Sequence, residues 1–378
     1  MPVFCTPAER YIGDLIAIPS VTGQEGLMKG YLEDAFGDLG LYVELQHVDS
    51  DRYNVVGRLG EGPLRLMLCT HMDVIPALDE SLWHTPPFEA CVRDGRIYGR
   101  GAADAKGSLA AAMEAMLRAK KGLKNGKGSV ALAAVVEEER GRSLGARKLV
   151  EKYRPDMCIV LEPTGLRLAT AHKGALRVAL TIRGRASHSS MPGVNAISIA
   201  CDAIKGLMKY RDEALGAEDP LLGRPTLEVT MIRGGERINV MPEKCLIYLD
   251  RRLILGETVE DAYDGLVHEV EKMGKKAGAA MDIKLLCSYP STSTSEDEGV
   301  VKLTKEALAR HGLPHAPVGF PAGCDMWTFH EKGIPTAILG PGHIEQAHGV
   351  DEYIEIGQMR LATGVYENII KMALSSPS

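Results

Sequence analysis

The chain has 378 residues, 45% of them hydrophobic, and a mean hydropathy near zero, which indicates a soluble globular protein with room for two domains of ordinary size. The 44 basic and 50 acidic residues give a formal charge of −6 and are interspersed, without the basic stripe typical of nucleic-acid binding. No apolar run approaches the roughly 20 residues that span a bilayer, and the opening MPVFCTPAER lacks a signal-peptide pattern, so we expect a cytoplasmic protein with neither a nucleic-acid nor a membrane partner.

The first half of the chain alternates between helix and strand patterns. Helical spacing covers residues 6–18 and 24–38, and strand patterns follow in YVELQHV, NVVGRL and LRLMLCTH. An Ala-rich helix is expected after Gly107, and two further buried strands in GSVALAAVVEEE and PDMCIVLEP. Continuous apolar strands separated by helices predict an α/β domain whose sheet is covered on both faces.

The pattern changes after Gly174. Strand, helix, strand, strand, helix and strand are predicted in turn for LRVALTIRGR, residues 195–215, TLEVTMI, CLIYLDRRLI, residues 258–278 and MDIKLL. This βαββαβ order is typical of a ferredoxin-like unit. A helix over 299–311 and the strand PTAILG then resume the earlier pattern. We therefore expect one α/β domain made of residues 1–174 and 287–378, interrupted by an inserted domain of residues 175–286.

Eight cysteines are scattered along the chain without a CxxC pair. Several lie inside apolar strand patterns such as MCIVLE. They are expected to be reduced core residues, and neither disulfides nor zinc ligands.

The stretch THMDV ends the strand pattern LRLMLCTH. In an extended chain His71 and Asp73 share one face, while Met72 takes the other. A carboxylate beside an imidazole is a pattern found in metal sites, where it accepts the proton of one ring nitrogen and leaves the other nitrogen for a cation. A salt-bridged histidine at a strand end is the alternative, and this stretch alone favours that alternative.

Four more clusters of acids or histidines lie at predicted strand ends or in loops, where open α/β sheets place their sites. Asp104 in YGRGAADAKG could be a helix N-cap, and the acidic triplet in VVEEERG could be a solvated strand end. Glu162 follows a buried strand, and GPGHIEQAHGVDEY offers His343 and His348. Three adjacent carboxylates after an apolar strand are costly unless a cation lies among them.

Taken together, these clusters supply a mixed nitrogen and oxygen set that suits zinc. The set consists of His71, Asp104, Glu139, Glu162 and one C-terminal histidine. Five ligands exceed one tetrahedral site. If Asp104 bridges with its two oxygens, each of two ions has three protein ligands and a shared water, with the metals roughly 3.5 Å apart. The sequence therefore predicts two zinc ions per chain, with cobalt as a substitute.

These motifs resemble those of the di-zinc aminoacylase and metallopeptidase family that includes acetylornithine deacetylase, succinyl-diaminopimelate desuccinylase and glutamate-releasing carboxypeptidases. The matching segments run in order along nearly the whole chain: THMDVIPA, PPFEACVRDGRIYGRGAADAKG with Trp83 before it, EEERG, LEPTG, GRASHSSMPGVNAI, INVMPEKC, LDRR and GPGHIEQAHGVDEY. Two departures touch no ligand: Glu137 stands where Asp is common, and Ala105 replaces a frequent Met.

The resemblance implies roles for residues of the larger domain, which would be the catalytic domain. One metal would be held by His71, Asp104 and Glu162, and the other by Asp104, Glu139 and His348. Asp73 would orient His71, and Glu138 would be the general base. On an extended strand end Glu138 and Glu139 point to opposite sides, so both can serve one site only if the backbone turns, which Gly141 favours.

The resemblance also implies roles for the inserted domain as a lid and dimerisation domain. His188 would help hold the developing oxyanion, often from the partner subunit of a dimer, and an ordinary loop histidine is the alternative. Asn239 and Arg252 resemble positions that bind the substrate's free carboxylate, a task suited to a guanidinium group. We expect a homodimer that forms through this domain.

The reaction that the resemblance implies is metal-dependent hydrolysis of the amide bond of an N-acyl amino acid, by a metal-bridging water with Glu138 as base. GPGHIEQAHGVDEY is closest to the acetylornithine deacetylase branch and favours N-acetyl or N-succinyl amino acids. A dipeptidase or carboxypeptidase acting on short peptides is the alternative within the enzyme class. A catalytically silent, metal-stabilised binding module is the alternative outside it, and the intact base and ligand set argue against that alternative.

Overall fold

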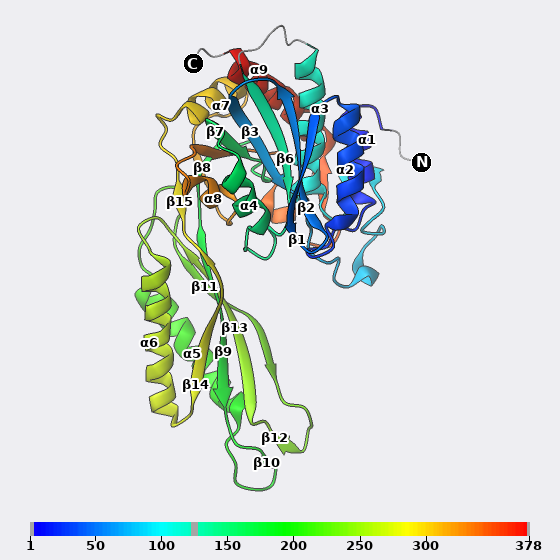
Figure 1. Cartoon of the computed structure of the whole chain (residues 1–378). Coiled ribbons are helices and arrows are strands. Elements are labelled where there is room, and N and C mark those ends of the chain that lie inside the picture. Colours follow the sequence, from blue (N-terminus) through cyan, green and yellow to red (C-terminus); the bar gives the residue numbers. More distant parts are fainter. Residues whose placement is uncertain (1–3, 122–127, 376–378) are drawn as a thin grey trace. The chain divides into compact units, whose positions relative to one another are not determined.

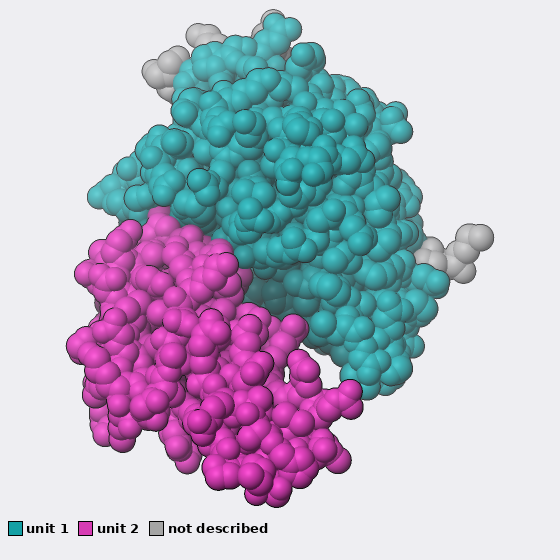
Figure 2. Space-filling view, turned by 60° about the horizontal axis from the view of Figure 1, so that its bottom comes forward, with its two compact units in different colours: residues 1–171, 293–320, 324–378 teal, residues 172–292, 321–323 magenta. Residues whose placement is uncertain are grey.

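The computed structural model describes residues 4–121 and 128–375. The chain forms two compact units, which Figure 2 colours separately. Unit 1 contains residues 1–171, 293–320 and 324–378, and unit 2 contains residues 172–292 and 321–323. The catalytic and lid roles inferred from the resemblance stay predictions. Within the described residues, no helix combines the length and apolar character needed to cross a membrane.

A mixed sheet forms the centre of unit 1. Its strands lie in the order β1 (Tyr42–Asp49), β2 (Arg52–Gly60), β6 (Ser129–Val135), β3 (Leu64–His71), β7 (Met157–Val160), β17 (Thr336–Ile338), β8 (Ala169–His172) and β15 (Thr292–Ser293), with β16 (Val318–Phe320) paired to β8. β6, β3, β7 and β17 are mutually parallel, so their carboxyl ends meet at one edge of the sheet. His71 ends β3, Glu162 lies two residues after β7 and Glu139 four residues after β6, so this parallel set positions the site.

Helices cover both faces of this sheet (Figure 1). One face carries α1 (Pro7–Ile16), α2 (Gly26–Asp38), α3 (Gly107–Lys120), α7 (Gly299–Arg310) and α9 (Ile356–Ser375), and the other carries α4 (Leu144–Lys152) and α8 (Met326–His330). In α3, the small side chains of Ala111, Ala112 and Ala115 are completely buried. They let α9 pack closely, and the core continues through Tyr366 to the apolar side chains of the sheet.

A second, three-stranded sheet of unit 1 lies beside the site. It has the order β18 (Tyr353–Glu355), β5 (Arg96–Tyr98) and β4 (Cys91–Arg93), all antiparallel. The chain leaves β5 and enters the short helical turn η2 (Ala102–Lys106), which leads into α3. The two other short turns are η1 (Glu80–Leu82) and η3 (Ile344–Gln346).

Unit 2 has the predicted βαββαβ order and is ferredoxin-like. Its elements are β9 (Gly174–Arg183), α5 (Ala196–Ala214), β11 (Thr226–Gly234), β13 (Lys244–Leu253), α6 (Val259–Ala277) and β14 (Met281–Tyr289), with a small ribbon of β10 (Ser187–His188) and β12 (Val240–Met241). The antiparallel sheet has the order β11-β13-β9-β14, which leaves β11 and β14 as edges. Each helix begins at a side-chain cap, Asn195 for α5 and Thr258 for α6, and their apolar sides form the core with β9 and β13.

None of the eight cysteines, all of which lie in the described part of the chain, forms a disulfide, in agreement with the sequence. The expectation that they are core residues holds for Cys69, Cys158, Cys245 and Cys324. Cys5 and Cys201 are exposed, because Cys5 precedes the first helix and Cys201 lies on an outward position of α5.

Candidate metal centre

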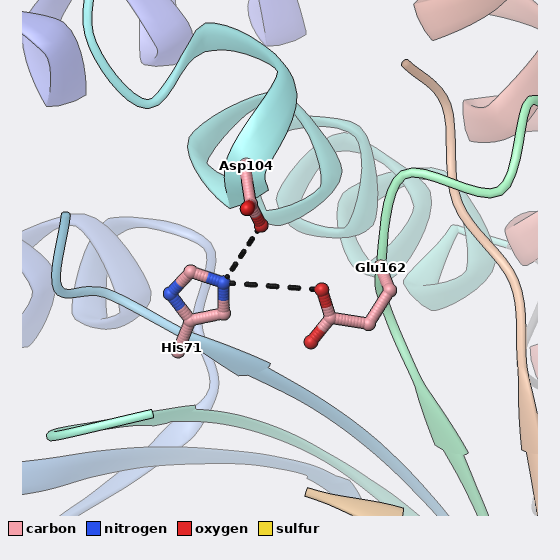
Figure 3. Close-up of side chains that lie close together, drawn as sticks. All are labelled: His71, Asp104 and Glu162. Atoms are coloured by element: carbon pink, nitrogen blue, oxygen red, sulfur yellow. Dashed lines mark hydrogen bonds and ion pairs between the residues drawn. The ribbon is translucent and has the colours of Figure 1, made fainter. Parts of the chain in front are cut away.

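Three candidate ligands from separate segments meet at the carboxyl ends of the parallel strands, as Figure 3 shows. His71 ends β3, Glu162 lies two residues after the end of β7, and Asp104 lies in η2. Nε2 of His71 lies 3.0 Å from Oδ1 of Asp104 and 4.0 Å from Oε2 of Glu162. One nitrogen and two carboxylate oxygens therefore converge on a common point, although the residues are far apart in sequence.

A second group shares Asp104 with the first. Nε2 of His348 lies 3.5 Å from Oδ2 of Asp104 and 2.8 Å from Oε2 of Glu139. The two oxygens of Asp104 thus face two different histidines. His348 has a φ of +66°, an unusual backbone conformation for a side chain with a Cβ, and such outliers are common at functional sites.

His343, the other histidine in the C-terminal loop, belongs to neither group. Its Nε2 lies 3.2 Å from the side-chain amide nitrogen of Gln358, and its backbone pairs with Thr164. The residue pattern alone left open which of the two histidines joins the cluster, the resemblance implied His348, and it is His348 that lies near Asp104 and Glu139.

The orientation of His71 corrects one detail of the sequence interpretation. Nδ1 of His71 lies 2.9 Å from the backbone carbonyl oxygen of Asp73, whereas the carboxylate of Asp73 is 3.7 Å away. That carboxylate accepts hydrogen bonds from the backbone N–H groups of Glu138 and Glu139 and from the hydroxyl of Thr22. A backbone carbonyl that accepts the proton of Nδ1 orients the ring as a carboxylate would. It likewise leaves the lone pair of Nε2 free to bind a metal.

The three residues of the acidic triplet, Glu137 to Glu139, follow the end of β6 and have different partners. Glu137 has a φ of +58°, so the extended backbone turns there, one step before the base predicted from the sequence. The buried carboxylate of Glu137 faces Arg52 and Arg142, while the N–H groups of Glu138 and Glu139 both point to Asp73. The turn required for Glu138 and Glu139 to serve one site therefore exists, and Gly141, with a φ of +71°, continues it.

Burial and neighbouring charges shift the pKa values of this cluster: those of Glu138, Glu162 and His71 are raised, whereas that of Asp104 is lowered by the hydrogen bond and charge of His71, although burial alone would raise it. Loss of solvation raises the pKa of Glu138 and of Glu162 well above the usual range of a glutamate, and neighbouring carboxylates add to the effect. Burial alone would lower the pKa of His71, but the hydrogen bond and charge of Asp104 raise it well above its usual value. Glu138 and Glu162 thus lose solvation and lie near other carboxylates, and a bound cation would offset both effects.

These residues fit a divalent metal. Each group offers one imidazole nitrogen and two carboxylate oxygens, and the ligand atoms of each group lie within 4.8 Å of one another. Oε1 of Glu162 is buried and has no hydrogen-bond partner among the described residues, an arrangement that costs free energy unless a cation binds it. Mixed nitrogen and oxygen ligands match zinc and related ions.

The sequence interpretation missed three polar residues around the cluster. Asp325 is 2% exposed, and burial raises its pKa to about 6. Glu352 and Arg100 form a buried ion pair of 2.6 Å behind the loop that carries Asp104. The available signal was an acid inside an otherwise apolar or glycine-rich segment, as in AGCDMW and HGVDEY, but such acids are also common on surfaces.

The three site residues predicted for the inserted domain lie in unit 2. His188 is exposed in β10, and its Nδ1 lies 2.7 Å from the hydroxyl oxygen of Ser190. Asn239 is exposed, and its backbone carbonyl accepts a hydrogen bond from the N–H of Ser189. Arg252 is half-buried in β13, where its guanidinium group donates to Asp250 and to the hydroxyl of Tyr289. Their roles stay predictions.

Known proteins share both the sequence and the fold. A curated acetylornithine deacetylase of Pectobacterium carotovorum is 34% identical over 359 residues, which cover 90% of this chain and 91% of that protein. An acetylornithine deacetylase of Photorhabdus laumondii is 33% identical, with 94% of each chain covered. A metallo-carboxypeptidase of Sulfolobus solfataricus has the same fold, with a TM-score of 0.80 and 22% identity over 98% of this chain and 99% of that chain.

A second solved structure also shares the fold. It is a protein of Bacillus subtilis described as a dinuclear metal binding peptidase, with a TM-score of 0.70 and 17% identity over 98% of both chains. The pattern of Peptidase family M20/M25/M40 matches residues 67–372, which include both ligand groups. The chain therefore belongs to Peptidase family M20/M25/M40 and is a metal-dependent hydrolase.

Proposed function

We propose that this protein hydrolyses the amide bond of N-acetyl or N-succinyl amino acids, with two zinc ions per chain. The two oxygens of Asp104 carry this proposal, because each faces a separate histidine and could serve a separate metal. The curated relatives named acetylornithine deacetylase, alike over nine-tenths of the chain, support the substrate class.

Six ligand contacts would hold the two ions. His71, Asp104 and Glu162 would bind one, and Asp104, Glu139 and His348 the other. When bound, the pair would supply a Lewis acid for the substrate's carbonyl oxygen and favour ionisation of a water molecule. Cobalt prefers similar ligands and would substitute for zinc.

Glu138 would act as the general base. Its pKa is raised by loss of solvation, which makes it a better proton acceptor than an ordinary glutamate. It would take a proton from the attacking water and deliver it to the leaving amine nitrogen, so the same carboxyl serves as base and then as acid. Asp73 fixes this residue by accepting its backbone N–H at 3.1 Å. Glu137, neutralised by two arginines, would have no part in the transfer.

Unit 2 would supply groups for substrate recognition. Arg252 would bind the substrate's carboxylate, although it now pairs with Asp250 at 2.6 Å and would have to exchange partners. Asn239 would contribute a neutral polar contact. His188 is exposed and could donate a hydrogen bond to the developing oxyanion, as the resemblance implies.

A homodimer would form through the same unit. β11 is an unpaired edge of its sheet, and Met231 and Ile232 on it are 38% and 47% exposed. Exposed apolar side chains on a free edge favour pairing with a second copy. His188 would then act on the metals of the partner subunit. Eight cysteines without a disulfide among them favour the reducing environment of the cytoplasm.

A panel of substrates tests the proposal. The purified protein, loaded with zinc, would be assayed on N-acetylornithine, other N-acetyl and N-succinyl amino acids, dipeptides and tripeptides, with the Glu138→Gln variant as the matched control for contaminating activity. We expect the highest kcat/KM on an N-acyl amino acid. Preference for dipeptides or for C-terminal residues of peptides would overturn the substrate class. Failure to hydrolyse any amide with metal bound would favour a binding module instead.

A further inference from the structure

We propose that Glu352 is a positioning residue that holds the loop of Asp104 in the shape required to bridge two metals. This inference rests on the proposed function, because it takes Asp104 and His348 as ligands. Glu352 directly precedes β18, is 2% exposed and lies outside both ligand groups. Its carboxylate contacts the loop between β5 and α3, and no ligand atom.

The carboxylate of Glu352 accepts four hydrogen bonds. Oε1 accepts the backbone N–H groups of Ala103 at 3.0 Å and of Asp104 at 3.1 Å. Oε2 accepts the backbone N–H of Gly101 at 3.1 Å and Nη1 of Arg100 at 2.6 Å. Each oxygen thus has two donors, and three of the four donors belong to the backbone that presents the bridging ligand.

The loop depends on these contacts because its own backbone offers few alternatives. The N–H groups at the start of a helix have no acceptor within the helix, and a carboxylate can serve as the missing acceptor. Gly101 has a φ of +84°, and a Cβ there would lie 2.6 Å from Cγ1 of Val74, so the chain passes close to the strand end. The hydrogen bonds to Glu352 therefore fix the position of Asp104 more directly than hydrogen bonds within the helix do.

The same segment also carries the ligand of the second metal. His348 precedes Glu352 by one short turn, and the backbone carbonyl of Glu352 accepts the N–H of Gly99 at 2.9 Å. The segment is thus joined to the Asp104 loop through both its main chain and its side chain. A displacement of Glu352 would change the separation of Asp104 and His348, and with it the second metal site.

Arg100 permits a buried carboxylate at this place. It is 1% exposed, pairs with Glu352 and lies 5.0 Å from the ring of Trp83. A buried acid next to the carboxylate of Asp104 would otherwise be repelled and would take up a proton. The positive charge of Arg100 offsets part of the cost of burying the carboxylate of Glu352 beside that of Asp104.

The variant Glu352→Gln tests the role with little change in shape. An amide has one oxygen and one NH₂ group, so in either orientation two of the four donors would face another donor. Glu355→Gln is the matched control, because Glu355 lies three residues later at the end of β18, is exposed and forms a 3.7 Å ion pair with Arg96. Glu352→Asp keeps the charge and both oxygens but withdraws them by one methylene group, and it serves as the second variant should the amide fail to fold.

The readouts are the zinc affinity of the metal-free proteins by competition with a chelator, their Co²⁺ absorption spectra, and their melting temperatures without metal. Outer contacts to metal ligands typically change affinity by roughly 10- to 100-fold. We expect such a loss, largest for the second equivalent of metal, and an altered Co²⁺ spectrum in every Glu352 variant that folds. Glu355→Gln should match the wild type.

Two results would overturn the inference. If the folded Glu352 variants have a lower melting temperature without metal but bind zinc and cobalt as the wild type does, Glu352 is only structural. If all variants match the wild type in every readout, the four contacts are irrelevant to the site. A wild-type protein that binds no metal would instead remove the proposed function, and this inference with it.

Discussion

Oδ1 of Asp73 accepts a hydrogen bond from the backbone N–H of Glu138 at 3.1 Å, although the two residues lie 65 positions apart. Oδ2 accepts the N–H of Glu139 at 3.2 Å and the hydroxyl of Thr22 at 2.8 Å. The carboxylate of Asp73 thus holds the proposed base and a proposed ligand, while its backbone carbonyl lies within hydrogen-bond distance of Nδ1 of His71. One aspartate connects the end of β3 to the end of β6.

Asp73→Asn should therefore disturb the position of Glu138 and Glu139. One acceptor oxygen becomes a donor that faces an N–H or hydroxyl group. We expect kcat to fall by roughly 10- to 100-fold, with weaker metal binding. Steady-state kinetics and metal analysis check this. Asp156→Asn, on a half-exposed residue that pairs with Arg65, should behave as the wild type. Normal kcat and metal content in Asp73→Asn would show that these contacts do not position the site.

Glu138→Gln should remove the proton acceptor and leave the ligands in place. The amide has nearly the shape of the carboxylate but cannot accept a proton, so kcat should fall by at least roughly 100-fold with KM little changed. Kinetics on the best substrate of the panel, with the metal content measured in parallel, give the result. Glu151→Gln is an exposed control. A Glu138→Gln protein with near-normal kcat and two metals would assign the base to another group.

Mixing two inactive proteins tests whether His188 acts across a dimer. A mixed dimer of His188→Ala and Glu138→Gln would contain one site with an intact base and an intact partner histidine, so part of the activity should return once subunits exchange. A mixture of Asp104→Ala with Glu138→Gln is the control and should stay inactive, because every active site in it lacks either the shared metal ligand or the base. If mixed dimers form, as tagged subunits would reveal, and activity stays absent, His188 does not act in trans.

The strand-end ligands could be predicted from the sequence, because a buried strand pattern followed by an acid or histidine is a local signal. β3 and the ferredoxin-like order of unit 2 are examples that the structure confirms. The acceptors of Asp73 and Glu352 could not be predicted in this way. Both bind backbone N–H groups far away in sequence, and a backbone N–H leaves no trace in the residue types.

Helix α9 is the largest element that the sequence interpretation left unassigned. It contains Gly357, Gly364 and Thr363, which lower helix propensity. Its stability comes from tertiary packing instead, since it is buried against α3 and the sheet. A helix that is apolar on most sides also lacks the clear periodicity by which α1 and α6 were recognised.

The most direct test of the two-metal account is a zinc titration of the metal-free wild-type protein, followed by the number of ions bound per chain and by hydrolysis of the preferred N-acyl amino acid. Because Asp104 offers one oxygen to each histidine, we expect binding to saturate at two zinc ions per chain. Asp104→Ala should lose the shared ligand and all activity. Saturation at one ion, or an Asp104→Ala protein with two ions and full activity, would contradict the account.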